Sequence, residues 1–185
     1  MTWAFFHVEA SPASFSASAG ADRRPRRSWH RRPRLSRRTR TGGLAGCRAA
    51  ASVGRVDIEE LPPGLYAEAV ELWHSCGLTR PWNDPGEDLR RAVRGPDSTV
   101  LGCLHDGELL GTAMVGHDGH RGWVYYLAVR EDHRRRGVGR RLMRACEQWT
   151  VARDVPKLQL MVRAGNEPVL ACYDRLGYET ADVVV

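Results

Sequence analysis

Two short segments of the chain combine residue types that could act on a phosphorylated ligand. In the first, Arg134-Arg135-Arg136 is followed by Gly137-Val138-Gly139, between an apolar run and a helical pattern. Glycines let the backbone approach a ligand closely, and the start of a helix presents unpaired N–H groups and a positive dipole end. This combination suits a pyrophosphate, with further charge from Arg140. The spacing matches neither GxGxxG nor GxxxxGK(S/T), and a solvated basic turn is the alternative interpretation.

The second segment runs from Asn166 through Tyr173 to Gly177 and Tyr178. Taken alone, it predicts a short capped helix with Tyr173 in the core and Gly177 as the terminating residue. Its chemical interest depends on where the fold places it relative to the first segment.

The surrounding pattern predicts the elements that must position both segments. Apolar alternation and short apolar runs predict strands at 53–58, 99–105, 108–116, 122–129, 157–162 and 178–185. Helical spacing predicts helices at 65–77, 85–94, 137–153 and 167–176. Asp84 before Pro85 is typical of a helix start, and Asp106-Gly107 of a two-residue hairpin turn. The order β-α-α-β-β-β-α-β-α-β predicts an α/β fold with a mixed central sheet.

The net charge of +6 is unevenly distributed over the 185 residues. Residues 1–52 contain 11 arginines and 2 acidic residues, whereas the remainder contains 17 basic and 20 acidic residues. The first part lacks apolar periodicity and predicts a disordered Arg-rich tail, dispensable for folding, ahead of a folded domain at 53–185. Arginine outnumbers lysine 27 to 1, which favours an inert tail or a start codon assigned too far upstream over a nucleic-acid-binding or targeting role.

Composition also argues against several classes of protein. No apolar run approaches the ~20 residues of a membrane-spanning helix, so no membrane partner is expected. The 5 cysteines are scattered and include no CxxC pair, which indicates neither a zinc site nor a disulfide framework. Reduced cysteines and a cytoplasmic location are expected, without a metal. The Arg-rich tail interleaves only Trp29 among its arginines, which is too little for specific nucleic-acid recognition.

Together, at this separation and in this order of elements, the two segments resemble the GNAT superfamily of N-acetyltransferases. The first matches the acetyl-CoA signature R/Q-x-x-G-x-G/A, and the second matches N-x-x-A/V-x-x-x-Y-x-x-x-G-F/Y. Further residues, among them Leu72-Trp73, 116–122 and 125–129, are similar to its bacterial YpeA-like branch. The resemblance covers about 53–185 and implies a mixed central sheet with helices on both faces.

The resemblance implies acetyl-CoA as cosubstrate, held where one strand ends and the next helix begins. The residues that correspond to its binding site are Leu127, Ala128, Val129, Arg134, Arg135, Arg136, Gly137, Val138, Gly139, Arg140, Asn166 and Tyr173. Among them, Tyr173 corresponds to the tyrosine that protonates the leaving thiolate, a role that suits a phenol.

The acceptor side departs from the family pattern. Many relatives carry a glutamate base on the strand before the signature, at places that here hold Trp123 and Tyr125. A base from the preceding turn, at His117, Asp118 or His120, is one interpretation, and an exposed polar turn is the other. The resemblance implies that the acceptor contacts Arg80, Trp82, Asn83 and Tyr125, with burial of Trp82 in the core as the alternative.

The expected reaction is direct transfer of the acetyl group to a primary amine of a small molecule or a protein. The alternative is an acyl-CoA-binding sensor or catalytically idle module, which the missing strand carboxylate favours and which Asn166 and Tyr173 disfavour. Relatives continue past the final strand, which here stops at Val183-Val184-Val185. Its edge is therefore expected to be short, frayed or completed by a second subunit of a homodimer.

Overall fold

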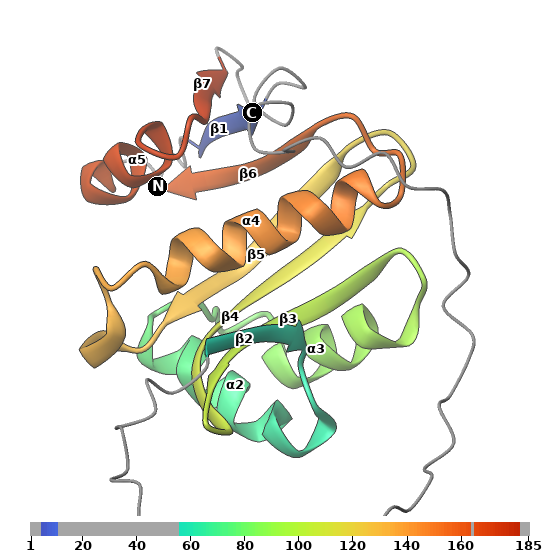
Figure 1. The fold of residues 1–185 in the computed structure, drawn as a ribbon, viewed down its shortest axis with the longest axis vertical. Coiled ribbons are helices and arrows are strands. Elements are labelled where there is room, and N and C mark those ends of the chain that lie inside the picture. Colours follow the sequence, from blue (N-terminus) through green and yellow to red (C-terminus); the bar gives the residue numbers. More distant parts are fainter. Residues whose placement is uncertain (1–4, 11–55, 164, 182–185) are drawn as a thin grey trace, which may run out of the picture.

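The computed structural model describes residues 5–10, 56–163 and 165–181 (Figure 1). Its strands are β1 (Phe5–Ala10), β2 (Val56–Glu60), β3 (Ser98–His105), β4 (Glu108–His117), β5 (Gly122–Val129), β6 (Leu158–Arg163) and β7 (Glu179–Ala181). Its α-helices are α2 (Tyr66–Ser75), α3 (Pro85–Arg94), α4 (Val138–Val151) and α5 (Glu167–Asp174). Two short 3-10 helices, η1 (Pro63–Leu65) and η2 (Glu131–His133), complete the described elements.

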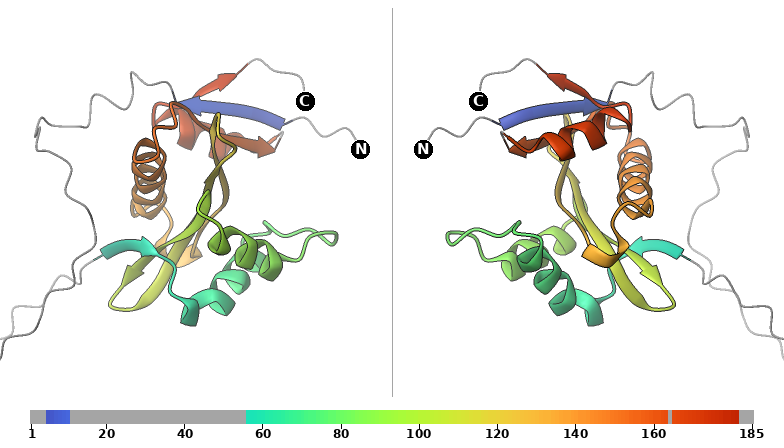
Figure 2. Two further views of the ribbon diagram at one scale, coloured as in Figure 1. Left: turned by 90° about the vertical axis from the view of Figure 1, so that its right-hand side faces the viewer. Right: turned by 90° about the vertical axis from the view of Figure 1, so that its left-hand side faces the viewer.

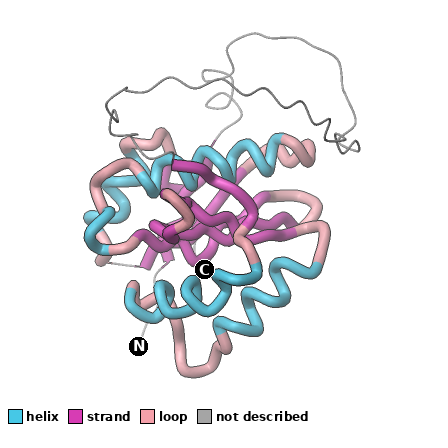
Figure 3. Tube along the Cα trace, turned by 60° about the horizontal axis from the view of Figure 1, so that its bottom comes forward, coloured by secondary structure: helices cyan, strands magenta, loops and turns pink. Residues whose placement is uncertain are grey.

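The strands form one mixed sheet between two layers of helices. Among the described residues, the sheet has 7 strands in the order β2-β3-β4-β5-β6-β1-β7. β5 and β6 are parallel, and the other neighbouring strands are antiparallel. Helix α4 covers one face, while α2 and α3 cover the other (Figures 2 and 3). The predicted α/β fold with helices on both faces is therefore confirmed.

Local sequence signals set several element boundaries. The Asp84 side chain accepts hydrogen bonds from the backbone N–H groups of Gly86 and Glu87, at 2.9 and 3.0 Å, and so caps α3. Asp106 and Gly107 both have positive φ, 50° and 86°, as a tight turn between β3 and β4 requires. From residue 56 onward, the predicted elements agree with the structure to within a few residues at each end.

The prediction of disorder is wrong for Phe5–Ala10, which form strand β1 inside the sheet. β1 pairs with β6 on one side and with β7 on the other. Aromatic and β-branched residues in this stretch suit a strand, but a strand is stabilised by partners that lie far away in the sequence. The predicted last strand, here β7, pairs with β1 on its inner side and is the outermost described strand of the sheet. Residues 11–52 of the predicted tail and 182–185 of the predicted last strand lie outside the described residues.

Gly111 marks the closest approach of β4 to its neighbours. A Cβ atom at this position would lie 2.6 Å from the carbonyl oxygen of Ala128 and 3.1 Å from Cγ1 of Val138. The first contact is with backbone, which cannot rotate away as a side chain can. The glycine therefore lets β4 and β5 lie together directly beneath the start of α4.

We predict that Gly111→Ala lowers the free energy of unfolding by about 1–3 kcal/mol, because the added methyl group overpacks this contact. Gly64→Ala is the matched control, since nothing lies within 4 Å of the Cβ that it would add. The control should change stability by less than about 0.5 kcal/mol. Urea unfolding measures both values, and equal stabilities of the two variants would contradict the packing described here.

Candidate active site

Strands β5 and β6 pair only over their first halves. Their register runs from Gly122 opposite Leu158 to Val124 opposite Leu160, and no later pair joins the two strands within the described residues. Figure 1 shows the strands diverging beyond this point, with α4 beginning between their C-terminal ends. The divergence brings two strand ends and a helix start to one place.

The divergence coincides with a β-bulge on β5. The register with β4 shifts between Thr112 and Met114, so that Tyr126 and Leu127 together lie opposite Ala113. Tyr126 has a φ of 49°, in the left-handed region that residues other than glycine adopt infrequently. Because a bulge bends its strand and increases the local twist, it turns the second half of β5 away from β6.

Three side chains hold Tyr126 in this conformation. Its ring stacks on Trp73, with the ring centroids 4.1 Å apart and the planes at 19°, and its hydroxyl donates to Asp88 Oδ2 at 2.8 Å. Trp73 Nε1 donates to Thr112 Oγ1 at 2.8 Å, and Thr112 Oγ1 donates to the carbonyl oxygen of Tyr126 at 3.4 Å. Burial and the Asp88 carboxylate raise the pKa of Tyr126 to about 12, so the hydroxyl remains a donor at neutral pH.

The divergence exposes one edge of the β5 backbone. The N–H of Arg130 donates to the carbonyl of Leu110 on β4 at 2.9 Å. Because backbone groups alternate in direction along a strand, the N–H of Val129 points away from β4, to the side that β6 has left. The carbonyl oxygen of Val129 accepts from Arg134 Nε at 3.3 Å and from Cys76 Sγ at 3.7 Å. The Val129 amide is therefore a backbone donor that faces the divergence.

The loop after β5 turns sharply into α4. Arg135 has a φ of 61° and Gly137 a φ of 85°, both left-handed. Gly137 is the N-cap of α4; no side chain caps this helix, and its first turn holds no acidic residue. The N–H groups of Val138, Gly139 and Arg140 are thus available at the positive end of the helix dipole. Successive amides in such a turn form a concavity that suits an anion.

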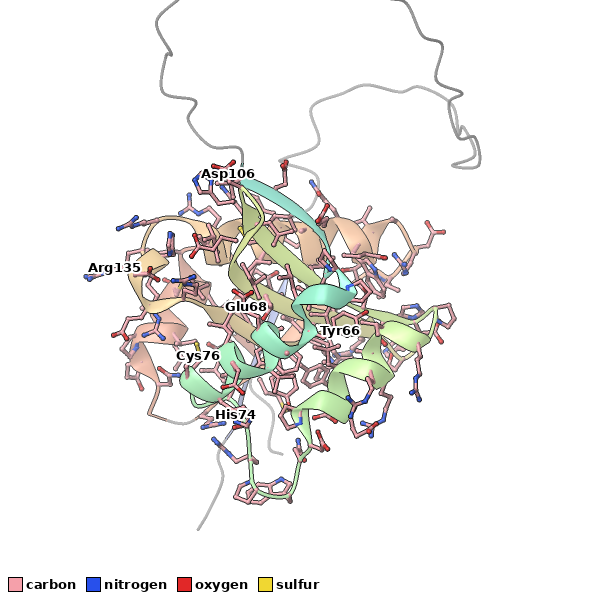
Figure 4. All side chains as sticks on the ribbon, turned by 90° about the horizontal axis from the view of Figure 1, so that it is seen from below. Tyr66, Glu68, His74, Cys76, Asp106 and Arg135 are labelled. Atoms are coloured by element: carbon pink, nitrogen blue, oxygen red, sulfur yellow. The ribbon has the colours of Figure 1, made fainter. Side chains whose placement is uncertain are left out.

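The side chains around the start of α4 fall into two groups. Arg134, Arg135, Arg136 and Arg140 are all exposed. Of their side chains, that of Arg134 alone forms hydrogen bonds among the described residues: it lies along the Val129 carbonyl, with Nη2 at 3.7 Å from Cys76 Sγ. That contact ties the loop to the end of α2, and Figure 4 shows Cys76 and Arg135 on the same side of the molecule. Apart from its chain neighbours and its own helix, a Cβ atom at Gly139 would have only Val129 Cγ2 within 4 Å, at 3.8 Å, so a side chain could start from this position without a clash.

Helix α5 brings Tyr173 to the sheet. Its side chain is 7% exposed, and its ring packs edge-on against Tyr178, with the centroids 5.8 Å apart. Burial raises the pKa of Tyr173 above that of a free phenol, so the hydroxyl is protonated at neutral pH. No described residue forms a hydrogen bond with this hydroxyl. The hydroxyl is not one of the described polar atoms that are completely buried without a hydrogen-bond partner. By contrast, the Tyr178 hydroxyl donates to Glu147 Oε1 at 2.9 Å and fixes α5 against α4.

Asn166 is the N-cap residue of α5, where β6 leads into that helix. Its side chain is exposed and makes no capping hydrogen bond, while its carbonyl accepts from the N–H groups of Val169 and Leu170 at 3.0 and 3.1 Å. The backbone therefore starts the helix, and the Asn166 amide remains available to a ligand.

The residues expected to supply a base lie at the opposite end of β5. His117 and His120 flank the β4–β5 turn before Gly122, roughly 10 Å or more along the strand from Tyr125 at ~3.3 Å per residue. His117 Nδ1 accepts from the N–H of Gly119 at 3.2 Å, and its Nε2 is 3.5 Å from Asp97 Oδ1. Both ring nitrogens of His117 therefore contact groups in or beside the turn, which is consistent with a structural role in that turn.

Asp118 stabilises the same turn. Its Oδ1 accepts from the backbone N–H groups of His120 and Arg121 at 2.8 and 2.7 Å, and its Oδ2 accepts from Trp123 Nε1 at 3.1 Å. These hydrogen bonds hold the pKa of Asp118 well below its usual range. Both oxygens of this carboxylate are thus engaged within the turn.

Of the residues expected to contact the acceptor, some lie at the bulge and the others are exposed to solvent or bonded within their own loop. Trp82 is 73% exposed, which excludes its burial in the core. Arg80 donates to the carbonyl oxygens of its own loop, and Asn83 interacts with the Tyr126 hydroxyl. Tyr125, 45% exposed, stacks with Trp123 at a centroid distance of 6.3 Å. The structure thus brings Asn83 and Tyr125 to the bulge.

Asp88 is the residue that sequence reasoning missed. Its carboxylate accepts from the Tyr126 hydroxyl through Oδ2 and from Arg91 Nη1 through Oδ1, at 2.8 and 2.9 Å. In the sequence, Asp88 and Arg91 form an ordinary i,i+3 surface pair on a helix. Only the packing of α3 over β5 reveals a carboxylate at the bulge.

Two further classes of site do not occur in the described ranges. Within residues 5–10, 56–163 and 165–181, no three His, Cys, Asp or Glu side chains gather as metal ligands. In the same ranges, no helix has both the length and the apolar character needed to cross a bilayer.

We predict that Tyr126→Phe lowers the free energy of unfolding by about 1–3 kcal/mol, because Asp88 loses a hydrogen-bond donor in a partly buried place. Tyr125→Phe is the matched control on the neighbouring residue, whose hydroxyl has no partner among the described side chains. It should change stability by less than about 0.5 kcal/mol. Chemical denaturation decides the point, and a Tyr126→Phe protein as stable as the control would remove the role given to this hydrogen bond.

Comparisons with known proteins match the domain as a whole. The model of the acetyltransferase (GNAT) family matches residues 67–178. The aminoglycoside N-acetyltransferase AAC(6′)-Iy, solved in complex with CoA, superposes with a TM-score of 0.65 at 16% identity over 74% of this chain and 97% of that protein. The ribosomal-protein-S18-alanine N-acetyltransferase from Escherichia coli gives 0.58 at 21% identity over 69% and 79% of the two chains.

A functionally unknown conserved protein from Staphylococcus epidermidis ATCC 12228 is similar over 97% of this chain, with a TM-score of 0.61 and 11% identity. This chain spans 58% of the length of that protein. At such identities the structural likeness establishes the fold, and it leaves the acceptor to be argued from the residues.

Proposed function

The chain belongs to the GNAT acetyltransferase family, and we propose that it transfers an acetyl group from acetyl-CoA to a primary amine by direct attack in a ternary complex. The observation that carries this proposal is the uncapped start of α4, placed where β5 and β6 diverge. A helix start with unpaired amides, a glycine open to ligand and three exposed arginines fits a pyrophosphate and a further phosphate.

On this proposal, the residues of the signature divide the binding of acetyl-CoA among them. The N–H groups of Val138, Gly139 and Arg140 bind the pyrophosphate, and the exposed Arg135, Arg136 and Arg140 side chains add charge. Arg134 acts by holding the loop against β5. The end of β5, Leu127 to Val129, pairs with the pantetheine arm through its free edge, and Asn166 approaches the arm from β6.

The chemistry requires a neutral amine, a stabilised oxyanion and a protonated leaving group. The amine nitrogen attacks the thioester carbonyl carbon, the carbon–sulfur bond breaks, and the thiolate takes a proton from the Tyr173 hydroxyl. The proton that the amine nitrogen loses on becoming an amide is released to solvent, and solvent returns one to Tyr173. Backbone donors on the free edge of β5 stabilise the charge that develops on the carbonyl oxygen. Because burial keeps Tyr173 protonated, it can donate at neutral pH.

We place the acceptor on the side of the bulge that faces α3. Tyr125, Asn83 and Asp88 present an aromatic ring, an amide and a carboxylate there, which suits an amine that arrives as a cation. The two named enzymes above act on an aminoglycoside and on an alanine of ribosomal protein S18. A screen of small amines and peptide N-termini, read by release of free thiol, separates a small-molecule acceptor from a protein.

Three finer assignments belong to the same proposal. Residues 53–185, with Phe5–Ala10 added to their sheet, form the catalytic domain of a bacterial, cytoplasmic enzyme, and the residues at 116–122 and 125–129 support its assignment to the YpeA-like branch. The acyl-CoA sensor is disfavoured, because a binding module has no use for a protonated phenol without a partner at Tyr173.

Gly139→Leu should fold like the wild type but bind acetyl-CoA at least about tenfold more weakly, because the side chain fills the space beside the α4 amides (about 1.4 kcal/mol). Gly139 suits this test better than Gly137, whose φ of 85° would strain any replacement. Gly64→Leu, whose added Cβ would have nothing within 4 Å, is the control. Calorimetry measures affinity and thermal melting measures folding; unchanged affinity in a folded Gly139→Leu protein would refute the site.

Tyr173→Phe keeps the ring and removes only the hydroxyl. We expect the single-turnover rate to fall by roughly ten- to a thousand-fold, because the donor acts mainly in the transition state. Acetyl-CoA affinity should change by less than about 1 kcal/mol. Tyr178→Phe, which alters the adjacent ring, is the control and should affect stability more than rate. A wild-type single-turnover rate in the Tyr173→Phe protein would show that Tyr173 serves packing alone.

The pH dependence provides a separate check on Tyr173. The folded-state pKa of its phenol lies above the free value of about 10, so deprotonation begins only above that pH. The ratio of wild-type to Tyr173→Phe single-turnover rates should therefore stay constant from about pH 7 to about pH 10. A ratio that collapses toward one well below the free phenol pKa would mean that another, more acidic group donates the proton.

A further inference from the structure

We propose that the slot between β6 and β7 is a binding site for one extended strand, that Phe5–Ala10 occupies it in cis, and that this strand fixes the β6 wall of the site. The inference goes beyond acetyl transfer, because it concerns which segment completes the sheet. It rests on backbone pairing and on the order of the strands.

Strand β1 pairs along both of its edges, over its whole length with β6 and through His7, Val8 and Glu9 with β7. Every residue of β6, from Leu158 to Arg163, has a register partner on β1, and so does every residue of β7. Strands β6 and β7 are separated by β1 in the sheet. Without β1, both would present unpaired N–H and C=O groups to the same gap, which is the condition under which a sheet edge accepts an added strand.

The second half of β6 depends on this strand more than the first half does. Its first three residues, Leu158 to Leu160, also pair with β5, but the divergence leaves Met161 to Arg163 without that neighbour. Among the described strands, β1 alone pairs with Met161–Arg163. Strand β7 is 3 residues long and is likewise paired with β1. A strand of this length is too short to hold its place without a partner.

These two strands carry the second half of the candidate site. Helix α5 carries Tyr173 and lies between these two strands in the chain. It begins shortly after the end of β6, and β7 begins shortly after the end of α5. Figure 2 shows β1, β7 and α5 together at one end of the molecule. The strand β1 thus joins the two anchors of α5. That Tyr173 and Asn166 act on acetyl-CoA rests on the proposed function, whereas the strand slot does not.

The strand that fills the slot, β1, is separated from the rest of the described domain by a long stretch of sequence. Residues 11–55 lie between β1 and β2, so the strand enters the sheet from far along the chain. Its affinity would come from main-chain hydrogen bonds, and these can form equally with a separate peptide. The tail that the charge pattern marks as dispensable therefore contains a segment on which the sheet depends.

Deletion of residues 1–10 from the full chain tests the slot. The melting temperature should fall by about 5 °C or more, since the sheet loses an interior strand. Amide hydrogen exchange should accelerate at least about tenfold in 161–163 and 179–181, because β1 is the sole described strand that pairs with them, whereas β3 and β4 should be unchanged. An unaltered melting temperature and exchange pattern would overturn the proposal.

A fluorescent peptide of residues 2–11, added to the deleted protein, should bind with one-to-one stoichiometry and restore the melting temperature. The same peptide with Val8→Pro should do neither, because Val8 lies opposite both Leu160 and Thr180 and proline removes a ladder donor. Equal binding of the two peptides would refute strand pairing.

If the deleted protein does not fold, Val8→Pro in the full chain replaces it, with Ser14→Pro beyond the strand as control. The first should lower the melting temperature by about 5 °C or more and the second should not; equal melting temperatures would overturn the proposal. None of these measurements uses acetyl-CoA. A protein that passes them without transferring an acetyl group would contradict the proposed function and leave the strand slot intact.

Discussion

The bulge at Tyr126 and Leu127 is the constraint on which the rest of the structure depends. A parallel pair that continued along β5 and β6 would close the sheet over the place where α4 begins. The bulge prevents this by turning β5, and the buried Trp73–Thr112 hydrogen bond and the Tyr126–Asp88 bond hold the turned backbone in place. Left-handed backbone at a tyrosine persists only where the surroundings fix it, and such strain is typical of functional sites.

The two walls of the divergence are supported differently. The β5 wall lies between the helix layers, with Ala128 and Val124 buried and Gly111 allowing close contact. The β6 wall has three register pairs to β5, pairs with β1 along its whole length, and buries Leu158, Leu160 and Val162 in the core that it shares with α4. The wall that leads into the loop before α4 is therefore paired with β4 along most of its length, whereas the second half of the wall that leads to Tyr173 is paired with β1.

The helix caps and tight turns could be predicted from the sequence. Asp84 before Pro85, Asp106-Gly107 and the glycines of the signature act through their immediate neighbours, so their pattern predicts the caps and turns that the structure confirms. What could not be predicted depends on contacts between distant segments. Phe5–Ala10 looked like part of a charged tail, and Asp88 looked like half of a surface ion pair. Each acquires its role from a neighbour far away in the chain.

The measurement that tests the central claim most directly is an amide NMR titration of the full chain with CoA. We expect the largest shifts at Val138 and Gly139, where the helix start would meet the ligand, and at Val129, whose N–H faces the divergence. The β4–β5 turn around Gly119, at the closed end of the strand pair, should not respond. Saturable binding that shifts the turn and leaves the first turn of α4 unchanged would contradict the claim that the divergence of β5 and β6 is the cosubstrate site.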